Sequence, residues 1–400
     1  MKVGEGFIPG IKYCTRCCMP ETQEGISFDA LGICKACQSS EQKMHINWKE
    51  REGLLAEILA DAKLRAGNGY DCILPISGGK DSFFQAHVLT QVYGMKPLAV
   101  TFSHNWFSET GYYNLQRCLE VFHMDHIMFT PNRKLVNNLA KKSVEMIGDT
   151  CWHCHAGVGA FPLQIACKFN IPLLIYGESI AESSGRASYF DPVTKYDREY
   201  FTKVSAKVSP DDMVCEYLSK RDLYPFEIPS AEECESKNIQ GIHLGDYIFW
   251  DEERQTEFVK REYGWRETEM EGAYKGYKSV ECIMAGMHDF TCYLKRGFGR
   301  ASMQAATDIR QGLLTREEAW QLVEEFDCVR PEALDYFLEI TGMSEQEFHE
   351  IMKKKRHEKI KDYELVVKKK HHKNTERIKP FAEYMIEKNI NQPDPRERNE

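Results

Sequence analysis

No stretch of about eighteen consecutive apolar residues occurs in the 400-residue sequence, so no segment has the character of a membrane-spanning helix. The first residues, Met1 to Lys12, lack the apolar core of a secretory signal peptide. The net charge of −9 provides no overall basic face for contacts with nucleic-acid phosphates. We therefore expect a cytoplasmic protein that is not inserted in a membrane and for which nucleic acid is a poor candidate partner.

One segment departs from this acidic balance. Residues 353–379 contain 12 Lys and Arg against 4 Asp and Glu. The simplest interpretation of such a run is a solvated helical tail. Contact with an acidic partner, a membrane surface or RNA is the alternative.

Short apolar runs alternate with segments of helical periodicity after about residue 70. The runs occupy residues 71–76, 97–102, 126–129 and 172–176, and the helical segments lie near 82–93, 110–123, 133–147 and 154–169. This alternation is typical of a parallel sheet with helices on both faces. We predict an α/β fold with a doubly wound parallel sheet, loops and short helices from 186 to 265, and a helical C-terminal region. In that region Thr315 and Glu318, and again Ser344 and Glu347, have the spacing of a helix capping box.

A loop suited to phosphate binding follows the first predicted strand. Its residues are Ser77-Gly78-Gly79-Lys80-Asp81-Ser82, and a helix is predicted directly after it. The glycines let the backbone approach a phosphate, while the serine hydroxyls and the helix N-terminus add hydrogen-bond donors. A Walker A loop is excluded, because Leu74 stands where that motif has its first glycine and Asp81 where it has Ser or Thr.

This loop resembles the Ser-Gly-Gly-x-Asp-Ser pattern of the PP-loop ATPases. The resemblance implies an adenine nucleotide α-hydrolase-like fold, in which ATP is split into AMP and pyrophosphate when a substrate oxygen attacks the α phosphate. It implies that residues 77–82 bind ATP, that Asp81 holds Mg²⁺ and that Lys80 neutralises phosphate charge. Glu178, in Gly177-Glu178-Ser179, stands where members carry a further acidic residue and is our third catalytic candidate, with Glu182 as a neighbouring acidic residue.

Two Cys-x-x-Cys pairs near the N-terminus predict a metal site. Cys14 and Cys17 are separated by 16 residues from Cys34 and Cys37. Each pair offers two thiolates on a tight turn, and two such pairs can surround Zn²⁺ tetrahedrally. We predict a structural zinc module, with Cys18 as an alternative ligand to Cys17.

A third pair, Cys151 and Cys154, precedes a predicted helix within the segment Thr150-Cys151-Trp152-His153-Cys154-His155. A single Cys-x-x-Cys pair can hold a second metal or an iron–sulfur cluster with a ligand from elsewhere, act as a redox pair, or only pack. The sequence leaves these interpretations open.

The wider pattern resembles the N-acetyl sugar amidotransferases of bacterial surface-glycan synthesis. Besides the motifs above, the resemblance rests on Gly245-Asp246-Tyr247, Trp250-Asp251, Tyr263-Gly264-Trp265, His288-Asp289-Phe290 and Tyr293 to Arg300. It implies that ATP adenylates the acetamido oxygen of a nucleotide-activated N-acetyl sugar and that ammonia then displaces AMP. The acetamidino product would enter lipopolysaccharide O-antigen or flagellar glycan.

No glutaminase signature accompanies these motifs. Residue 2 is Lys rather than a cysteine that could become N-terminal, and no cysteine has a Gly-x-Cys-x-Gly surround. We therefore expect a separate ammonia-supplying glutaminase subunit of the imidazole glycerol phosphate synthase type.

Weaker candidates lie in the segment 288–300. Lys295, Arg296 and Arg300 can bind a sugar carboxylate or a diphosphate, with surface solvation as the alternative. His288 can act as an acid or base, although a lone histidine is more often structural.

Two other functions remain open: a PP-loop tRNA thiolation enzyme with an iron–sulfur cluster, and a non-catalytic scaffold that binds zinc and nucleotide. We expect four regions along the chain. They are a zinc module (1–45), a PP-loop ATP-binding domain (46–185), a substrate-binding and helical region (186–345) and a basic helical tail (346–400).

Overall fold

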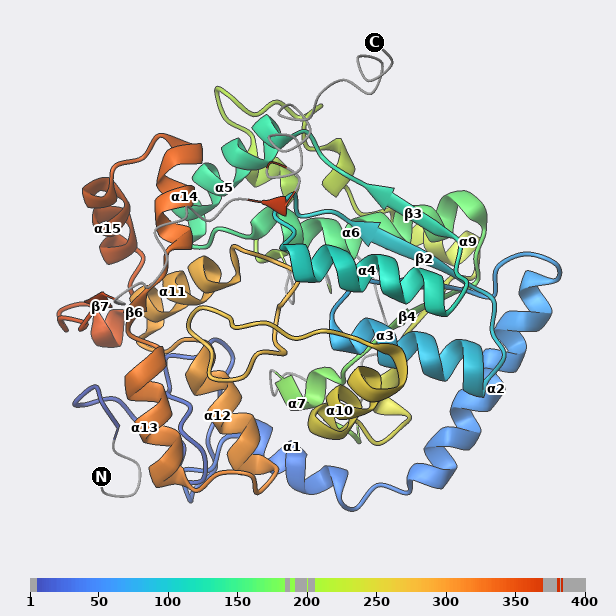
Figure 1. Ribbon diagram of the computed structural model, residues 1–400, viewed down its shortest axis with the longest axis horizontal. Coiled ribbons are helices and arrows are strands. Elements are labelled where there is room, and N and C mark those ends of the chain that lie inside the picture. The colour runs from blue at the N-terminus through green and yellow to red at the C-terminus, as the bar shows by residue number, and fades with distance from the viewer. Residues whose placement is uncertain are drawn as a thin grey trace, which may run out of the picture.

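The computed structural model describes residues 6–183, 188–190, 200, 206–369, 380, 381 and 383, apart from the side chains of 182 and 183. A five-stranded sheet in the order β3-β2-β1-β4-β5 lies at its centre (Figure 1). The strands are β1 (Cys72–Pro75), β2 (Pro97–Phe102), β3 (His126–Phe129), β4 (Leu173–Tyr176) and β5 (Gln240–His243). Each strand pairs in parallel with its neighbour, which confirms the predicted parallel sheet.

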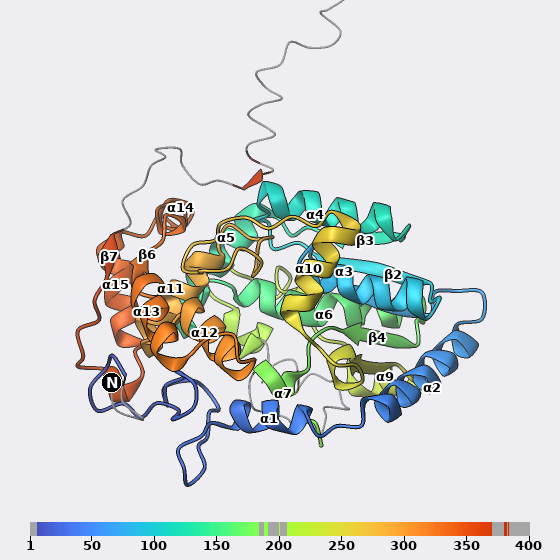
Figure 2. The same cartoon turned by 60° about the horizontal axis from the view of Figure 1, so that its bottom comes forward.

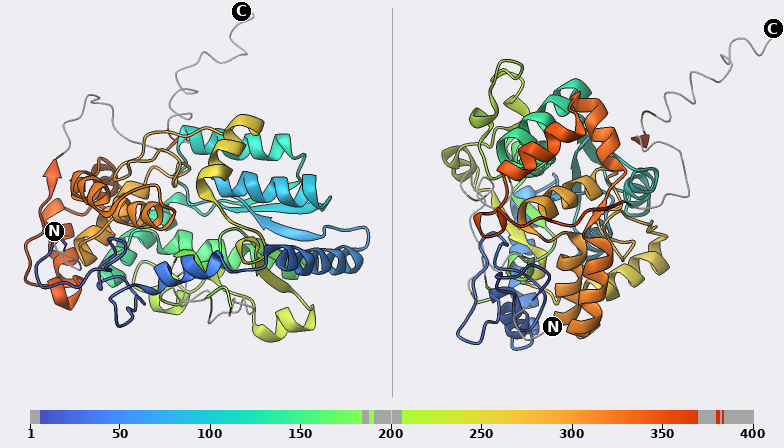
Figure 3. Two further views of the ribbon diagram at one scale, coloured as in Figure 1. Left: turned by 90° about the horizontal axis from the view of Figure 1, so that it is seen from below. Right: turned by 90° about the vertical axis from the view of Figure 1, so that its left-hand side faces the viewer.

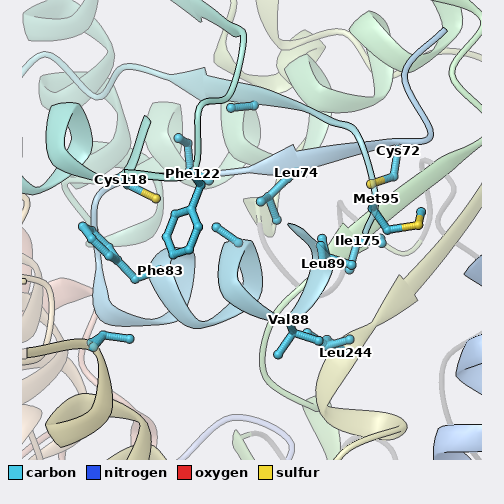
Figure 4. Close-up of a cluster of buried hydrophobic side chains, with 14 of the residues drawn as sticks. Cys72, Leu74, Phe83, Val88, Leu89, Met95, Cys118, Phe122, Ile175 and Leu244 are labelled. Carbon is cyan, nitrogen blue, oxygen red and sulfur yellow. The ribbon is translucent and has the colours of Figure 1, made fainter. Parts of the chain in front are cut away.

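Helices cover both faces of this sheet, as Figure 3 shows in its left view. One face carries α3 (Lys80–His87), α4 (Glu109–Val121) and α10 (Glu252–Tyr263), with α2 (Trp48–Ala66) beside them, and the other carries α5 (Arg133–Ile147) and α6 (Trp152–Phe169). The reason is the two-residue period of a strand. Leu74 packs with Phe83 of α3 (Figure 4), whereas its neighbour Ile73 packs with Leu139 of α5.

The strand order places the carboxyl ends of β1 and β4 side by side at the point where it reverses. From β1 the chain continues to β2 and β3 on one side, and β4 then returns to the other side of β1. In open α/β sheets, ligands collect in the crevice at such a reversal. The predicted phosphate loop follows β1 and Glu178 follows β4, so both lie at this position.

Local signals explain where most of these helices begin and end. Asn132 caps α5 by accepting hydrogen bonds from Lys134 N and Leu135 N, and Gly148 ends the helix in the left-handed conformation. The predicted helix near 82–93 is not uniform, because after His87 the chain continues as a π-helical turn, Val88–Val92.

Most of the remaining elements form a helical region beside the sheet, and this region includes the N-terminal cysteines (Figure 2). They are α1 (Lys35–Lys43), α7 (Ile180–Ser183), α11 (Ala285–Arg296), α12 (Arg300–Arg310), α13 (Arg316–Phe326), β6 (Val329–Arg330), α14 (Ala333–Thr341), α15 (Glu345–Lys354) and β7 (Lys368–Lys369). The short helix α9 (Ala231–Ser236) instead precedes β5 and contacts α6 through Cys234. The capping box of Thr315 and Glu318 is confirmed at α13. At α15, Ser344 accepts from Glu347 N, which is one half of the predicted box.

The segment from 186 to 265 is more regular than predicted. It contains the edge strand β5 and the twelve-residue helix α10. The sequence pattern did not predict β5, because its four residues include one apolar side chain, Ile242, and apolar and polar residues do not alternate along it. The start of α10 did carry a signal, since Asp251 accepts from Arg254 N and Gly264 ends the helix with φ 71°.

Part of the basic segment 353–379 belongs to the packed structure. Lys368 and Lys369 form β7, which pairs with β6 next to α14, and Ile360 is buried among the residues of the cysteine region. Residues 370–379 lie outside the described part of the chain.

Candidate active site

The predicted phosphate loop connects β1 to α3 at the carboxyl edge of the sheet. Ser77 N donates to Ser82 Oγ (3.1 Å), and Gly79 N donates to Ser77 Oγ (3.3 Å). Gly79 is the extended N-cap residue of α3, and no side chain of the described residues caps this helix. A helix N-terminus without a side-chain cap, preceded by a Gly-rich turn, suits a phosphate group.

Gly78 shows why this loop requires glycine. Its φ is 90°, and a Cβ atom would lie 2.7 Å from both Gly111 O and Leu115 N of α4. The carbonyl of Gly78 accepts a hydrogen bond from Trp265 Nε1 (3.0 Å). The loop is therefore wedged between α4 and the segment after α10, and both contacts fix its shape.

A cavity of about 400 Å³ opens over the loop. Its walls come from the carboxyl ends of four strands and from α6: Pro75, Ile76, Ser77, Asp81, Ser82, Gln85, Val100, Phe102, His104, Cys154, Val158, Pro162, Tyr176, Gly177, Glu178, His243 and Glu281. The lining combines apolar and aromatic residues with hydroxyls and carboxylates. This combination suits a ligand with a flat apolar part and a phosphate part.

Charged side chains converge below and beside the cavity. Lys80 is 2% exposed, and its Nζ donates to both carboxylate oxygens of Asp81 (2.8 and 2.7 Å). Burial disfavours the Lys80 ammonium, but Asp81, Glu252 and Glu178 together hold its pKa above the ordinary value. Lys278 forms an ion pair with the buried Glu252, whose pKa is lowered by Lys278 and Lys80 in spite of its burial.

The three predicted catalytic residues are thus brought together. Asp81 and Glu178 line the cavity, whereas Lys80 lies beneath the loop and neutralises the surrounding carboxylates. Glu178 is an exposed residue whose side chain lines the open space of the pocket. Partial desolvation in the pocket wall, together with the negative charges of Glu252 and Asp81, raises the pKa of Glu178 to about 7. Carboxylates so placed are suitable oxygen ligands for Mg²⁺.

His243 supports Glu178 from below. It lies at the end of β5, its Nδ1 is 2.7 Å from Glu178 O, and its ring stacks on Tyr176. Burial lowers the pKa of His243 to about 4, so the neutral ring donates from Nδ1 to that carbonyl oxygen. The side chain of the other acidic candidate, Glu182, lies outside the described residues.

Glu281 reaches the cavity from a distant segment that the sequence did not indicate. Its backbone is held by a bridge between Phe107 and Cys282 and by hydrogen bonds from Ser108 N to Glu281 O and from Ile283 N to Trp106 O (3.0 Å each). Burial raises the pKa of Glu281. No local pattern marks this residue, because its position depends on contacts across about 170 residues of chain.

The four N-terminal cysteines form a compact, buried group. Cys14 Sγ lies 3.9 Å from Cys37 Sγ, and Cys17 Sγ lies 3.8 Å from Cys34 Sγ. A tetrahedral zinc site with Zn–S bonds of about 2.3 Å has sulfur–sulfur separations of about 3.8 Å, so the group fits Zn²⁺. Cys18 Sγ instead donates to Ser302 O (3.4 Å), which assigns the set to Cys17.

The two cysteines of the central pair, Cys151 and Cys154, lie in different surroundings. Cys154 lines the cavity, whereas Cys151 lies in a group with Asp149 and His288 whose potential ligand atoms are within 4.8 Å of one another. Asp149 Oδ1 already accepts from His288 Nδ1 (3.0 Å) and Cys151 N (2.9 Å). Asp149 also holds the pKa of His288 well above its ordinary value, although burial acts in the opposite direction. The group is therefore a hydrogen-bonded network in which His288 is charged.

The weaker candidates Lys295, Arg296 and Arg300 do not act as one patch. Lys295 Nζ donates to Ile147 O (2.8 Å), and burial lowers the Lys295 pKa to about 8. Arg296 pairs with Glu24 (2.7 Å). Arg300 alone lines a cavity that also contains Glu178 and Lys278.

Comparison with known proteins identifies the C-terminal part. Residues 253–377 match the family described as LPS biosynthesis protein WbpG-like, C-terminal domain. This part of the chain is similar to the WbpG-like domain. The matched segment supplies Lys278, Glu281 and Arg300 to the site and includes α11 to α15.

Two further proteins are similar over longer segments. An uncharacterized protein of Methanocaldococcus jannaschii is 26% identical over 306 residues, which cover 76% of this chain and 90% of that protein. The solved structure of NMN synthetase from Francisella tularensis aligns with 56% of this chain and 98% of its own, with 14% identity and a TM-score of 0.28. At that score the fold assignment rests on the sheet itself. None of the described helices is both long and apolar enough to cross a bilayer.

Proposed function

We propose that this chain is an ATP-dependent, AMP-forming amidotransferase that converts the acetamido group of a nucleotide-activated N-acetyl sugar into an acetamidino group. The observation that carries the proposal is the cavity over the phosphate loop, which is lined by Ser77 and Ser82 together with the carboxylate residues Asp81 and Glu178. The WbpG-like domain supports a role in lipopolysaccharide synthesis. The resemblance to PP-loop enzymes supports ATP as the nucleotide.

The reaction overcomes the poor electrophilicity of an amide. The acetamido oxygen attacks the α phosphorus of ATP, and pyrophosphate leaves. Ammonia then adds to the activated carbon, and AMP leaves with the former amide oxygen. Ammonia gives up two protons in the process, and the basic amidine takes one of them back. Much of the acceleration in such a site comes from orientation and charge stabilisation.

Each residue near the loop has a defined task in this scheme. Ser77, Ser82 and the backbone N–H groups at the start of α3 bind phosphate oxygens. Asp81 and Glu178 would hold Mg²⁺, which neutralises phosphate charge when bound. Lys80 offsets the negative charge of the nearby carboxylates, since its ammonium donates to Asp81 and interacts electrostatically with Glu178 and Glu252.

A separate glutaminase subunit is the expected source of ammonia. The chain has no recognisable glutaminase motif, so ammonium should support turnover by the purified protein and glutamine should not. Efficient use of glutamine by the chain alone would contradict this part of the proposal.

The proposal is tested by incubating the protein with ATP, Mg²⁺, ammonium and a panel of nucleoside diphosphate N-acetyl sugars. We expect AMP and a sugar product whose mass falls by the difference between O and NH. Asp81→Asn should lower the rate of AMP formation by about 10²–10³-fold. The matched control is Asp61→Asn, because Asp61 is exposed on α2 and pairs only with Arg65 among the described residues. Formation of AMP with tRNA but with no sugar would contradict the sugar assignment and favour RNA thiolation.

A further inference from the structure

A second cavity lies between the cysteine region and α12. It has a volume of about 180 Å³, and its lining includes Glu178, Trp250, Lys278, Arg300, Gln304 and Arg310. Glu178 also lines the cavity over the phosphate loop, so the two cavities meet at this carboxyl group.

Buried polar groups without protein partners mark this cavity as a ligand site. Gln304 is 4% exposed, yet neither its amide nitrogen nor its amide oxygen has a hydrogen-bond partner among the described residues. The same holds for the indole N–H of Trp250, which is 2% exposed. An unsatisfied buried amide is costly to a fold, so it is retained where a ligand supplies the missing bonds.

Three cations add a second and independent feature. Lys278 pairs with Glu252 at the inner end of the cavity. Arg300 begins α12 and uses Nε to bond Asp289 Oδ2 (2.7 Å), which fixes the orientation of its guanidinium. Arg310 ends the same helix. Arginine is the side chain best suited to phosphate and carboxylate groups.

The face of α12 gives the cavity a direction. Arg300, Gln304, Thr307 and Arg310 follow helical spacing, and Arg310 lies about 15 Å beyond Arg300 along the axis. Arg300 acts electrostatically on Glu281, which lines the cavity over the phosphate loop. The Arg300 end therefore faces the junction of the two cavities, and the Arg310 end lies away from it.

We propose that this second cavity binds the acceptor, a nucleoside diphosphate N-acetyl sugar, with the sugar ring inside and the diphosphate at Arg310. The acetamido carbonyl then lies beside Glu178, opposite the α phosphate of ATP, and Gln304 and Trp250 hydrogen-bond the ring substituents. The volume is below the roughly 300–1,000 Å³ of pockets that hold drug-sized ligands, which fits one sugar ring and leaves the nucleoside outside. This inference rests on the proposed function.

The cysteine region forms the opposite wall through Met19, Gln23 and Ala36. The zinc module is therefore part of the acceptor site as well as a stabilising element. Its cysteines pack in one cluster with Ala305 and Ala306 of α12, so the wall and the helix are held as one unit.

The test uses the variants Gln304→Leu and Arg310→Gln in the full chain. We expect each to raise the KM for the sugar nucleotide by about 10-fold, with the KM for ATP unchanged. Matched controls are Gln311→Leu and Arg261→Gln, because these residues are exposed and line neither the acceptor cavity nor the cavity over the phosphate loop. Equal KM values for the variants, the controls and the unmodified chain would overturn the assignment of the cavity while leaving the reaction intact.

Direct binding separates this proposal from the reaction itself. Calorimetric titration with a panel of UDP-linked N-acetyl sugars needs no turnover, and we expect binding that weakens in Arg310→Gln and in Gln304→Leu. Binding that both variants lose, without AMP formation, would support the site and reject the reaction. No binding by any member of the panel would overturn the site. Thermal melts of the variants identify a loss of folding. Arg310→Gln is the less disruptive of the two substitutions, because Arg310 is only half-buried.

Discussion

Gly111 lets the segment around Glu281 pack closely against α4 near the phosphate loop. Replacing Gly111 with alanine should therefore displace this segment and destabilise the fold. A Cβ atom on Gly111 would lie 2.2 Å from Glu281 Cα and 2.8 Å from its carbonyl carbon and oxygen. These are backbone atoms, held by the hydrogen bonds of Ser108 and Ile283. The segment around Glu281 must therefore move if a methyl group is to fit.

The expected change in the free energy of unfolding combines two destabilising contributions and one stabilising contribution. Overpacking of a tight contact costs about 1–3 kcal/mol. Each of the two backbone hydrogen bonds that hold the segment contributes about 1 kcal/mol, and a shift weakens them in part. Helix propensity acts in the other direction, because Gly111 lies in the first turn of α4 and alanine is favoured by up to about 1 kcal/mol. We expect a net destabilisation of about 2 kcal/mol for Gly111→Ala.

Urea denaturation of Gly111→Ala and of Gly53→Ala provides the measurement. Gly53 lies inside α2, and its Cβ atom would meet nothing within 4 Å, so alanine there should stabilise the chain by about 0.5–1 kcal/mol. AMP formation should fall about 10-fold in Gly111→Ala and stay unchanged in Gly53→Ala. A Gly111→Ala protein as stable and active as Gly53→Ala would refute the reasoning.

Three further predictions concern the acid group, the metal and the N-terminus of α12. Because the folded-state pKa of Glu178 is about 7 against an ordinary value of 4.5, the folded chain binds more protons between these values, so its stability falls as pH rises through this window. Urea midpoints should show that fall in stability, and the fall should be absent in Glu178→Gln. In the unmodified chain the affinity for Mg²⁺-ATP should rise across pH 7, and Glu178→Gln should abolish this rise as well. Elemental analysis should find one zinc per chain, and this zinc should be lost in Cys34→Ser. It should be retained in Cys18→Ser, because the thiol of Cys18 bonds a backbone carbonyl. Loss of zinc in both variants would contradict the assigned ligands. The carboxylate of Asp327 accepts hydrogen bonds from three backbone N–H groups at the start of α12. Asp327→Asn should therefore lower the free energy of unfolding by about 2–4 kcal/mol in urea denaturation. It should also raise the KM for the acceptor by displacing Arg300, and an unchanged KM would contradict this.

The sequence predicted the parts of the fold that local chemistry controls. Four of the five sheet strands match the predicted runs closely, because each is a short apolar segment between turn signals. The phosphate loop and the four-cysteine group were also predictable, since their function depends on residues close together in the chain. The strand β5 was missed because an edge strand with one buried apolar residue has no period-two pattern.

The sequence could not reveal how distant segments complete the site. Glu281 and Lys278 come from an irregular segment, and their places depend on the bridge to Phe107 and on the missing side chain at Gly111. The sequence predicted a structural zinc module at residues 1–45, but it could not show that the four cysteines pack in one cluster with residues of α12 and α13, or that residues near them line the second cavity.

The sequence by itself determined the Gly-rich loop after the first strand, the group of four cysteines and the alternation of strands and helices, because these depend on residue type and short-range spacing. Only the tertiary structure decided that Glu178 joins two cavities, that Arg300 separates from Lys295 and Arg296, and that Gln304 is buried without a protein partner. These features arise where segments hundreds of residues apart pack together, and side-chain contacts of that range leave no periodic trace in the sequence.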